Sequence, residues 1–128
     1  MSGGAGIGLA RAYDPPQKGE GARLLVDRIW PRGLSKEKLS CDDWIKEAAP
    51  SAELRRWFAH DAKKWAAFRA RYEAELEERP EAVERCLAWC REGRVTLLFG
   101  AKDREHNQAV ALRDYLARKL KGEAEARR

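Results

Sequence analysis

The charged residues with the most unusual position in this sequence come directly after the apolar run of residues 24–26. Asp27 and Arg28 directly follow that run, and Arg32 comes four residues after Arg28. A charged side chain within a buried strand is costly unless it is paired or faces a polar site. These three residues therefore predict either a ligand site or a buried ion-pair network, in which Asp27 pairs with Arg28, Arg32 or Arg11.

A second polar segment follows another apolar run, at residues 95–99. It contains Lys102 and Asp103, and then His106 and Asn107. If both runs are parallel strands of one sheet, the two polar segments leave it at the same carboxyl edge, where open α/β sheets bind ligands. We therefore expect the two segments to form one site.

Positive charge dominates the predicted site. Arg28, Arg32 and Lys102 supply three formal charges, and the helix expected after Asp103 offers unpaired backbone N–H groups. Such a combination favours an anion, with phosphate and carboxylate the simplest candidates.

Proton transfer is the one catalytic role that the sequence offers. His60 or Asp103 could move a proton, because an unperturbed histidine titrates near pH 6.5 and Asp103 belongs to the predicted site. Asp27 is the third catalytic candidate, and we expect it to orient Arg28 or Arg32. The alternative for His60 is a purely structural position at a break between two helices.

A metal centre is not expected. The chain has two histidines, and Cys86 and Cys90 stand four residues apart, which is typical of one apolar helix face and not of a zinc or redox motif. The sequence names no cofactor.

Three segments, at residues 7–13, 23–30 and 94–99, have the composition of β-strands. Apolar residues on both faces of the second indicate a covered, central strand. We therefore expect an α/β fold with a small, mostly parallel sheet of about three strands and helices packed on it, in a single domain.

Helical periodicity and capping residues predict helices around these strands. In the last of them, Asp103 is expected to act as the N-cap, with His106 and Asn107 in the first turn and Gly122 at the end. The other expected helices span residues 36–39, 42–48, 50–59, a long stretch after Asp61, and 80–92.

Composition limits the class of protein. The 128 residues are 44% hydrophobic and 37% charged, with no apolar run of bilayer length and no secretory leader, so we expect a globular cytoplasmic protein without membrane contact. The net charge is +5, but residues 113–128 carry six basic and three acidic residues, which leaves +2 for the rest. The basic excess is therefore largely terminal and is weak support for a nucleic-acid partner.

The chain resembles the YeaO-like proteins, a family classified as domain of unknown function 488. The resemblance covers about residues 8–120. Its matching stretches are Arg11-Ala-Tyr13-Asp14, Leu25-Val-Asp-Arg-Ile-Trp-Pro-Arg-Gly-Leu34, Trp44-Ile-Lys46, Ala49-Pro-Ser51, Leu54-Arg-Arg-Trp-Phe-Ala-His-Asp61, Leu97-Leu-Phe-Gly-Ala-Lys-Asp103 and His106-Asn107.

The resemblance implies one α/β domain and a set of characteristic residues, but no agreed activity. We expect a flexible segment at residues 1–7, the α/β domain at 8–121 and a polar tail at 122–128. The characteristic residues fall on Asp27, Arg28, Arg32, Lys46, Ser51, His60, Lys102, Asp103, His106 and Asn107.

These observations predict a protein that binds a small anionic ligand, such as a phosphorylated metabolite or a nucleotide, at the carboxyl edge of the sheet. They leave open whether the ligand is also turned over. The predicted ligand-binding residues are Arg28, Arg32, Lys46, Ser51, Lys102, His106 and Asn107. Two alternatives remain: a nucleic-acid accessory protein that uses the basic C-terminal helix, and a non-catalytic structural or adaptor domain of unspecified oligomeric state.

Overall fold

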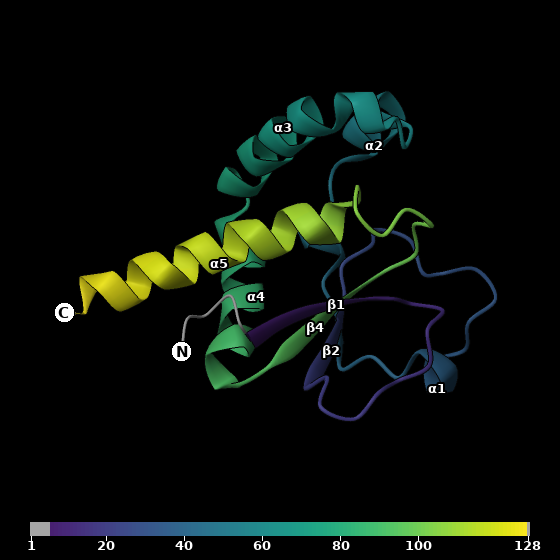
Figure 1. Ribbon diagram of the computed structural model, residues 1–128, viewed down its shortest axis with the longest axis horizontal. Helices are drawn as coiled ribbons and strands as arrows, with labels where there is room; N and C mark the ends of the chain where they lie inside the picture. The colour runs from purple at the N-terminus through teal and green to yellow at the C-terminus, as the bar shows by residue number, and fades with distance from the viewer. Residues whose placement is uncertain (1–5, 128) are drawn as a thin grey trace.

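The core of the protein is a sheet of four parallel strands, shown in Figure 1. The computed structural model describes residues 6–127. The order is β1 (Ile7–Arg11), β4 (Val95–Phe99), β2 (Ala22–Leu25) and β3 (Asp43–Trp44), and every neighbouring pair runs parallel. All residues of β4 are buried, as its apolar composition requires. The predicted parallel α/β sheet is confirmed, with β3 as a short additional strand at one edge.

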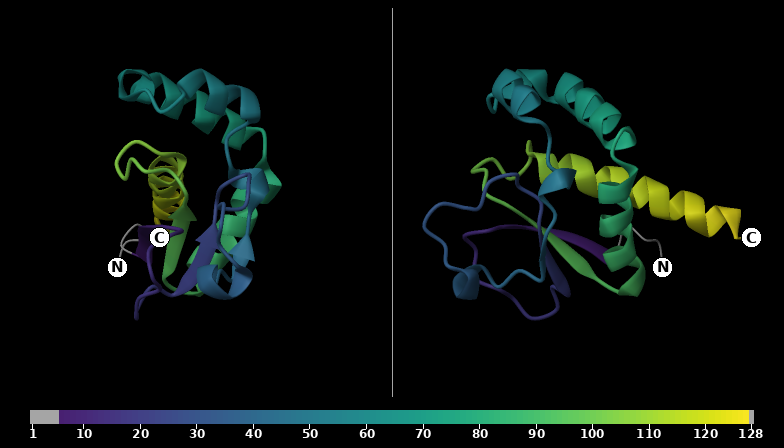
Figure 2. Two further views of the ribbon diagram at one scale, coloured as in Figure 1. Left: turned by 90° about the vertical axis from the view of Figure 1, so that its right-hand side faces the viewer. Right: turned by 180° about the vertical axis from the view of Figure 1, so that it is seen from behind.

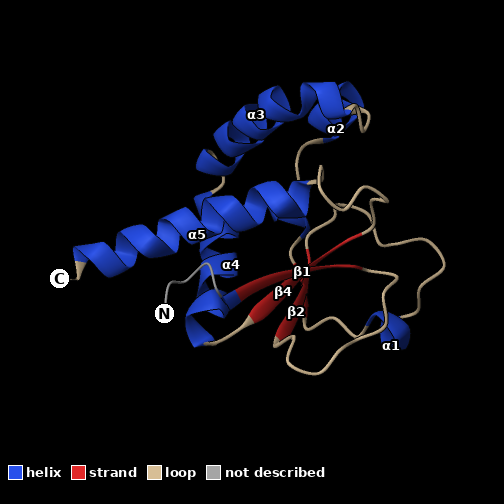
Figure 3. Ribbon diagram, in the orientation of Figure 1, coloured by secondary structure: helices blue, strands red, loops and turns tan. Residues whose placement is uncertain are grey.

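Helices cover one face of this sheet (Figure 3). They are α2 (Ala52–Phe58), α3 (Trp65–Glu77), α4 (Pro80–Glu92) and α5 (Gln108–Ala126). Helix α5 lies along β1 and β4, and α3 packs on α4 and α5 farther from the sheet, as the views in Figure 2 show. The main hydrophobic core lies between these layers and includes Leu24, Leu97, Phe68, Tyr72 and Leu112.

The opposite face is covered mainly by the chain between β2 and β3, which includes the short helix α1 (Lys36–Leu39). Leu25 and Leu98 point to this side and form a small core with Ala12 and Leu39. Trp30 and Trp44 extend it with an edge-to-face contact of 5.4 Å between ring centroids. Both faces are therefore buried, which a parallel sheet requires.

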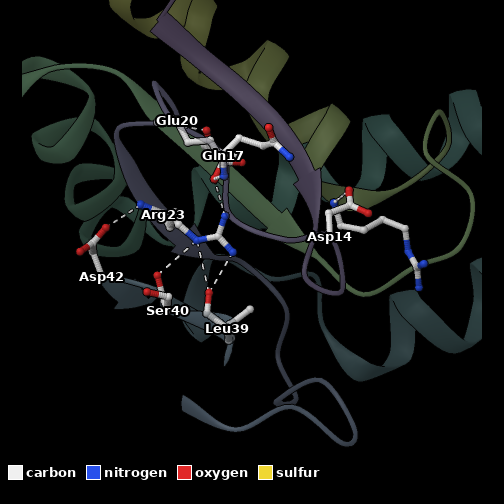
Figure 4. Close-up of polar contacts among 9 residues, drawn as sticks. Asp14, Gln17, Glu20, Arg23, Leu39, Ser40 and Asp42 are labelled. Carbon is white, nitrogen blue, oxygen red and sulfur yellow. Dashed lines mark hydrogen bonds and ion pairs between the residues drawn. The ribbon is translucent and has the colours of Figure 1, made fainter. Parts of the chain in front are cut away.

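A buried arginine at the start of β2 fixes the segment before β3 (Figure 4). The Arg23 guanidinium donates to the carbonyls of Leu39 and Ser40 and forms an ion pair with Glu20 at 2.5 Å. The Arg23 backbone N–H donates to Asp42 at 2.8 Å. These bonds hold residues 39–42 against β2, so that the next residues can pair as β3.

Two predicted elements of this region are wrong. The strand expected to reach residue 30 ends at Leu25, and the chain from Asp27 onward forms a loop. The helix expected at 42–48 is replaced by β3 and a 3-10 helix at Lys46–Ala48. The second difference arises because the backbone of this segment bonds to β2, as in the 2.9 Å bond from Ile45 N–H to the Leu25 carbonyl.

The last helix begins later and ends later than predicted. Its N-cap is Asn107, whose side-chain oxygen accepts from the N–H groups of Ala109 and Val110, and not Asp103. The helix also continues past Gly122 to Ala126, where Glu123 pairs with Arg91 of α4 and anchors the final turn. The sequence predicts a flexible segment at residues 1–7. Residues 1–5 lie outside the described residues, and Ile7 belongs to β1.

No helix within residues 6–127 combines the length and the apolar composition needed to cross a bilayer.

Candidate functional site

The two polar loops meet at the carboxyl edge of the sheet, where β2 and β4 end. The Asp27 carboxylate accepts a hydrogen bond from the Gly100 N–H at 2.8 Å and a second from the side-chain amide of Gln108. Arg11 donates to the carbonyls of Gly100 and Ala101 at 3.2 and 2.9 Å and so fixes the second loop to the end of β1. Asp27 is therefore the point at which the loops are joined.

An open pocket of about 390 Å³ lies at this junction, a volume within the range of small-molecule sites. The loops after β2 and β4, the segment from residue 49 to 60, α3 and the start of α5 form its walls. The lining residues are Asp27, Arg28, Ile29, Ala49, Pro50, Arg55, Arg56, Phe58, His60, Phe68, Gly100, Ala101, Asn107 and Gln108.

Asp27 is a largely buried carboxyl that forms no ion pair within residues 6–127. Burial raises its pKa from 3.8 to about 6, and the hydrogen bonds from Gly100 and Gln108 and the charge of Arg55 offset only part of this effect. The predicted pairing of Asp27 with Arg28, Arg32 or Arg11 does not form. Arg28 instead donates to the carbonyls of Ala49 and Pro50 at 3.2 and 3.3 Å.

Arg55 and Arg56 differ from most arginines of the protein. Within residues 6–127, neither guanidinium makes a hydrogen bond, an ion pair or a ring contact, and both residues are exposed at the pocket. By contrast, Arg69, Arg85 and Arg118 are each paired with a carboxylate. The pocket thus presents two guanidinium groups that make no hydrogen bond or ion pair within residues 6–127, although the charge of Arg55 acts on Asp27.

The structure brings four of the predicted site residues to the pocket. Asp27, Arg28, His60 and Asn107 line it, with His60 at an exposed position where the backbone φ is +58°. Such a conformation is uncommon for a residue other than glycine and occurs at functional sites more often than elsewhere.

Three predicted basic residues lie on the surface outside the pocket lining. Arg32 and Lys102 are exposed, although the loops that carry them contribute Ile29 and Ala101 to the pocket. The Lys46 ammonium lies over the Trp44 ring, 5.3 Å from its centroid. The positive charge of the pocket comes instead from Arg28, Arg55 and Arg56.

Asp103 and His106 form a local turn before α5. Asp103 accepts from the backbone N–H groups of Glu105 and His106, and its other oxygen lies 3.0 Å from His106 Nδ1. The two backbone bonds, followed by the His106 ring, lower the pKa of Asp103. The His106 ring packs edge-on against Trp65. These contacts position Asn107, the N-cap of α5, at the pocket.

Ser51 caps α2. Its hydroxyl accepts from the Leu54 N–H at 3.1 Å and donates to Glu75 at 2.6 Å, and its own N–H donates to Glu75 at 2.8 Å. Because α2 carries Arg55 and Arg56, Ser51 contributes to the pocket by fixing the position of this helix.

We expect Ser51→Ala to lower the free energy of unfolding by about 1 to 2 kcal/mol, because it removes the N-cap and one partner of Glu75. Urea denaturation followed by circular dichroism measures this loss. Ser51→Thr keeps a capping hydroxyl and should lose clearly less, whereas equal losses in both variants would show that the cap is not the cause.

Sequence reasoning missed Arg55, Arg56 and Gln108. Arg55 and Arg56 come four and five residues after Ser51, the N-cap of α2. Gln108 comes directly after Asn107, the N-cap of α5. Gln108 could have been found from its place at the start of α5, but Arg55 and Arg56 lie in the last turn of α2 and have the ordinary appearance of a solvated helix face.

A larger hollow of about 670 Å³ lies on another side of the 45–50 segment. Two of its arginines are bonded within the protein: Arg79 donates to the Glu47 and Ala49 carbonyls, and Arg85 pairs with Asp43. The third, Arg28, also lines the pocket described above. Glu47, Glu78 and Glu81 add negative charge, so this hollow is poorly suited to an anion. In the described part of the chain, no three potential metal ligands converge.

Comparison with known proteins places this chain in a group of bacterial relatives. A family model described as the inactive DUF488-N3 subclade matches residues 6–128. The uncharacterised protein YeaO of Escherichia coli is 42% identical over 110 residues, which are 86% of this chain and 96% of that protein. Uncharacterised proteins of Mycobacterium bovis and Mycobacterium tuberculosis are 38% identical over 78 residues, which are 61% of this chain and 66% of each relative. No solved structure gives a significant match.

The family match spans nearly the whole described fold, including both loops of the pocket and the helix that carries Arg55 and Arg56. The chain therefore belongs to the inactive DUF488-N3 subclade and is a YeaO-like protein.

Proposed function

We propose that this protein binds a small anionic ligand, such as a phosphorylated metabolite or a nucleotide, in the pocket at the carboxyl edge of the sheet. The observation that carries the proposal is the pair Arg55 and Arg56, which line the pocket and form no ion pair within residues 6–127. The only carboxyl among the described lining residues is that of Asp27, which feels the charge of Arg55. Planar guanidinium groups bind phosphate and carboxylate oxygens in pairs of hydrogen bonds.

The surroundings of the pair support an anion. Arg28 adds a third positive charge, and Asn107 and Gln108 place the amino end of α5 at the pocket, where the helix dipole favours negative charge. The negative charge of Asp27 repels an anion, so we expect the anionic group of the ligand to bind beside Arg55 and Arg56 and not beside Asp27. The cytoplasmic location that the sequence predicts would give the site access to such metabolites.

We favour a protein that binds the ligand without converting it chemically. The description of the family as inactive points this way. The three candidate catalytic groups are also separated in their contacts: Asp103 bonds to His106, Asp27 to Gly100 and Gln108, and the His60 ring lies near Phe58.

Titration with inorganic phosphate by isothermal calorimetry tests the proposal. We expect Arg55→Ala and Arg56→Ala each to weaken binding about tenfold, the effect of losing one charged hydrogen-bonding group. Arg118→Ala is the matched control, because Arg118 pairs with Glu73 away from the pocket and should leave the affinity unchanged. Binding that is indifferent to Arg55 and Arg56, or no binding, would refute the proposal.

The basic C-terminal helix does not favour a nucleic-acid function. Arg118 pairs with Glu73, Lys119 with Glu77 and Arg127 with Glu123. Their charges are therefore partly neutralised within the protein, and we base no function on this helix.

A further inference from the structure

The Asp27 carboxylate is the feature of the pocket that an anion alone does not explain. It lines the pocket, and its two hydrogen-bond donors, Gly100 and Gln108, are both neutral. No ion pair within residues 6–127 includes it. Burial raises its pKa to about 6, so at neutral pH the group is ionised but incompletely solvated. A ligand that brings hydrogen-bond donors would supply the missing solvation.

The donors should belong to a neutral part of the ligand. Arg28, Arg55 and Arg56 line the same pocket and would repel a cationic ligand such as a free guanidinium or ammonium compound. A carboxylate is an acceptor only, and it pairs best with two adjacent N–H groups. We therefore expect a ligand with an anionic group at one end and, at the other end, a neutral group that carries two adjacent N–H donors.

Apolar residues at the pocket suit a flat ring. Phe58 and Phe68 line it with the small part of each residue that is exposed, 5% and 2%, and stack on each other with centroids 4.3 Å apart. At the rim, Ile29 is 63% exposed, which is unusual for a large apolar residue in this protein. A planar heterocycle would cover Ile29 and contact the aromatic wall.

Building on the anion site proposed above, we propose that the pocket takes a guanine nucleotide, with the N1–H and 2-amino groups of the base on Asp27 and the phosphate on Arg55 and Arg56. Guanine presents two adjacent N–H donors on one edge. Adenine presents an acceptor, N1, beside its amino group and would leave part of the carboxylate unpaired. Gly100 and Gln108 hold the carboxylate in place for this contact.

The test compares four ligands by isothermal calorimetry at neutral pH: GMP, IMP, AMP and ribose 5-phosphate. We expect GMP to bind at least about tenfold more tightly than AMP, with IMP, which lacks the 2-amino group, in between. Asp27→Asn should bring the affinities for GMP and AMP close together and should not weaken that for ribose 5-phosphate, because it removes a negative charge from the pocket. Arg55→Ala should weaken all four ligands by a similar factor.

A second variant guards against an effect on folding. A Cβ added at Gly100 would lie 2.9 Å from the Asp27 carboxylate oxygen, so Gly100→Ala should displace the carboxylate and also reduce the preference for GMP. Equal affinities of the unmodified protein for GMP, AMP and ribose 5-phosphate, with Arg55 still required, would overturn the guanine assignment and leave the anion site standing. If none of the four ligands nor inorganic phosphate binds, both proposals fail.

Discussion

Asp27→Asn should raise the free energy of unfolding by about 2 to 3 kcal/mol at pH 8 and leave it almost unchanged near pH 3. Burial raises the pKa of Asp27 from 3.8 to about 6 in the folded protein, and a shift of this size corresponds to about 3 kcal/mol. A neutral asparagine fits the same position and keeps an acceptor for the Gly100 N–H.

The direction of the pH dependence follows from the raised pKa. Below about pH 4 the carboxyl is protonated in both the folded and the unfolded protein, and the two variants are equally stable. Between about pH 4 and pH 6 the unfolded chain loses this proton before the folded protein does, so the original protein loses stability relative to Asp27→Asn. Above pH 6 the difference is constant. Urea denaturation of both variants across this range measures it.

Asp43→Asn provides a control of opposite sign. Although burial raises the pKa of Asp43, the hydrogen bonds from Arg85 and Trp89 outweigh it and lower the pKa on balance. Asp43→Asn should therefore destabilise the protein at neutral pH, and this loss should shrink as the pH falls. An Asp27→Asn variant that is less stable at pH 8 would show that Asp27 is a structural group whose charge the fold needs.

Gly21→Ala should cost at least about 3 kcal/mol of folding stability. Gly21 has a φ of +71°, and a Cβ at this position would lie 2.0 Å from the Arg94 carbonyl oxygen. This carbonyl accepts from the Ala22 N–H at 3.0 Å at the start of the β2–β4 pairing. The clash involves backbone on both sides, so relief requires the separation of two central strands.

Gly19→Ala separates the clash from the backbone conformation. Gly19 has a similar φ of +83°, but a Cβ there would meet no atom within 4 Å. It should therefore cost about 1 kcal/mol, the penalty of a left-handed alanine alone. Thermal and urea denaturation of the two variants give the comparison, and equal losses would contradict the close contact with Arg94.

Periodicity and capping predicted most of the fold because they are local properties. Pro80 and Gly93 bound α4 as expected, and Ser35 and Ser51 cap the helices that follow them. The two-residue strand β3 could not be predicted in this way. It exists because the backbone of residues 42–45 bonds to Arg23 and Leu25, which are distant in sequence.

The start of α5 illustrates a different limit. Asp103 and Asn107 are both good N-cap residues four positions apart, and the sequence alone does not decide between them. In the structure, Asp103 forms its own turn with Glu105 and His106, and Asn107 takes the cap. The His106 ring between them packs edge-on against Trp65, a long-range contact that the local sequence does not predict.

The two polar loops meet at the predicted edge of the sheet, but the pocket there is lined in part by residues that the sequence did not single out. Parallel strands bring the loops of Asp27 and Gly100 together, as their hydrogen bond shows. Arg55 and Arg56 reach the same place because the segment 45–50, held by Arg28 and Arg79, turns α2 toward this edge. That turn depends on long-range contacts to backbone carbonyls, which no sequence pattern reveals.

The most direct test of the anion site is a map of the amide N–H resonances of the protein during titration with inorganic phosphate. The proposed site predicts the largest shifts at Asp27, at residues 55–60 and at Gly100 and Gln108, with little change in the far half of α5. It also predicts that Arg55→Ala reduces these shifts at a given phosphate concentration. Shifts confined to the C-terminal helix, or spread evenly over the surface, would contradict it.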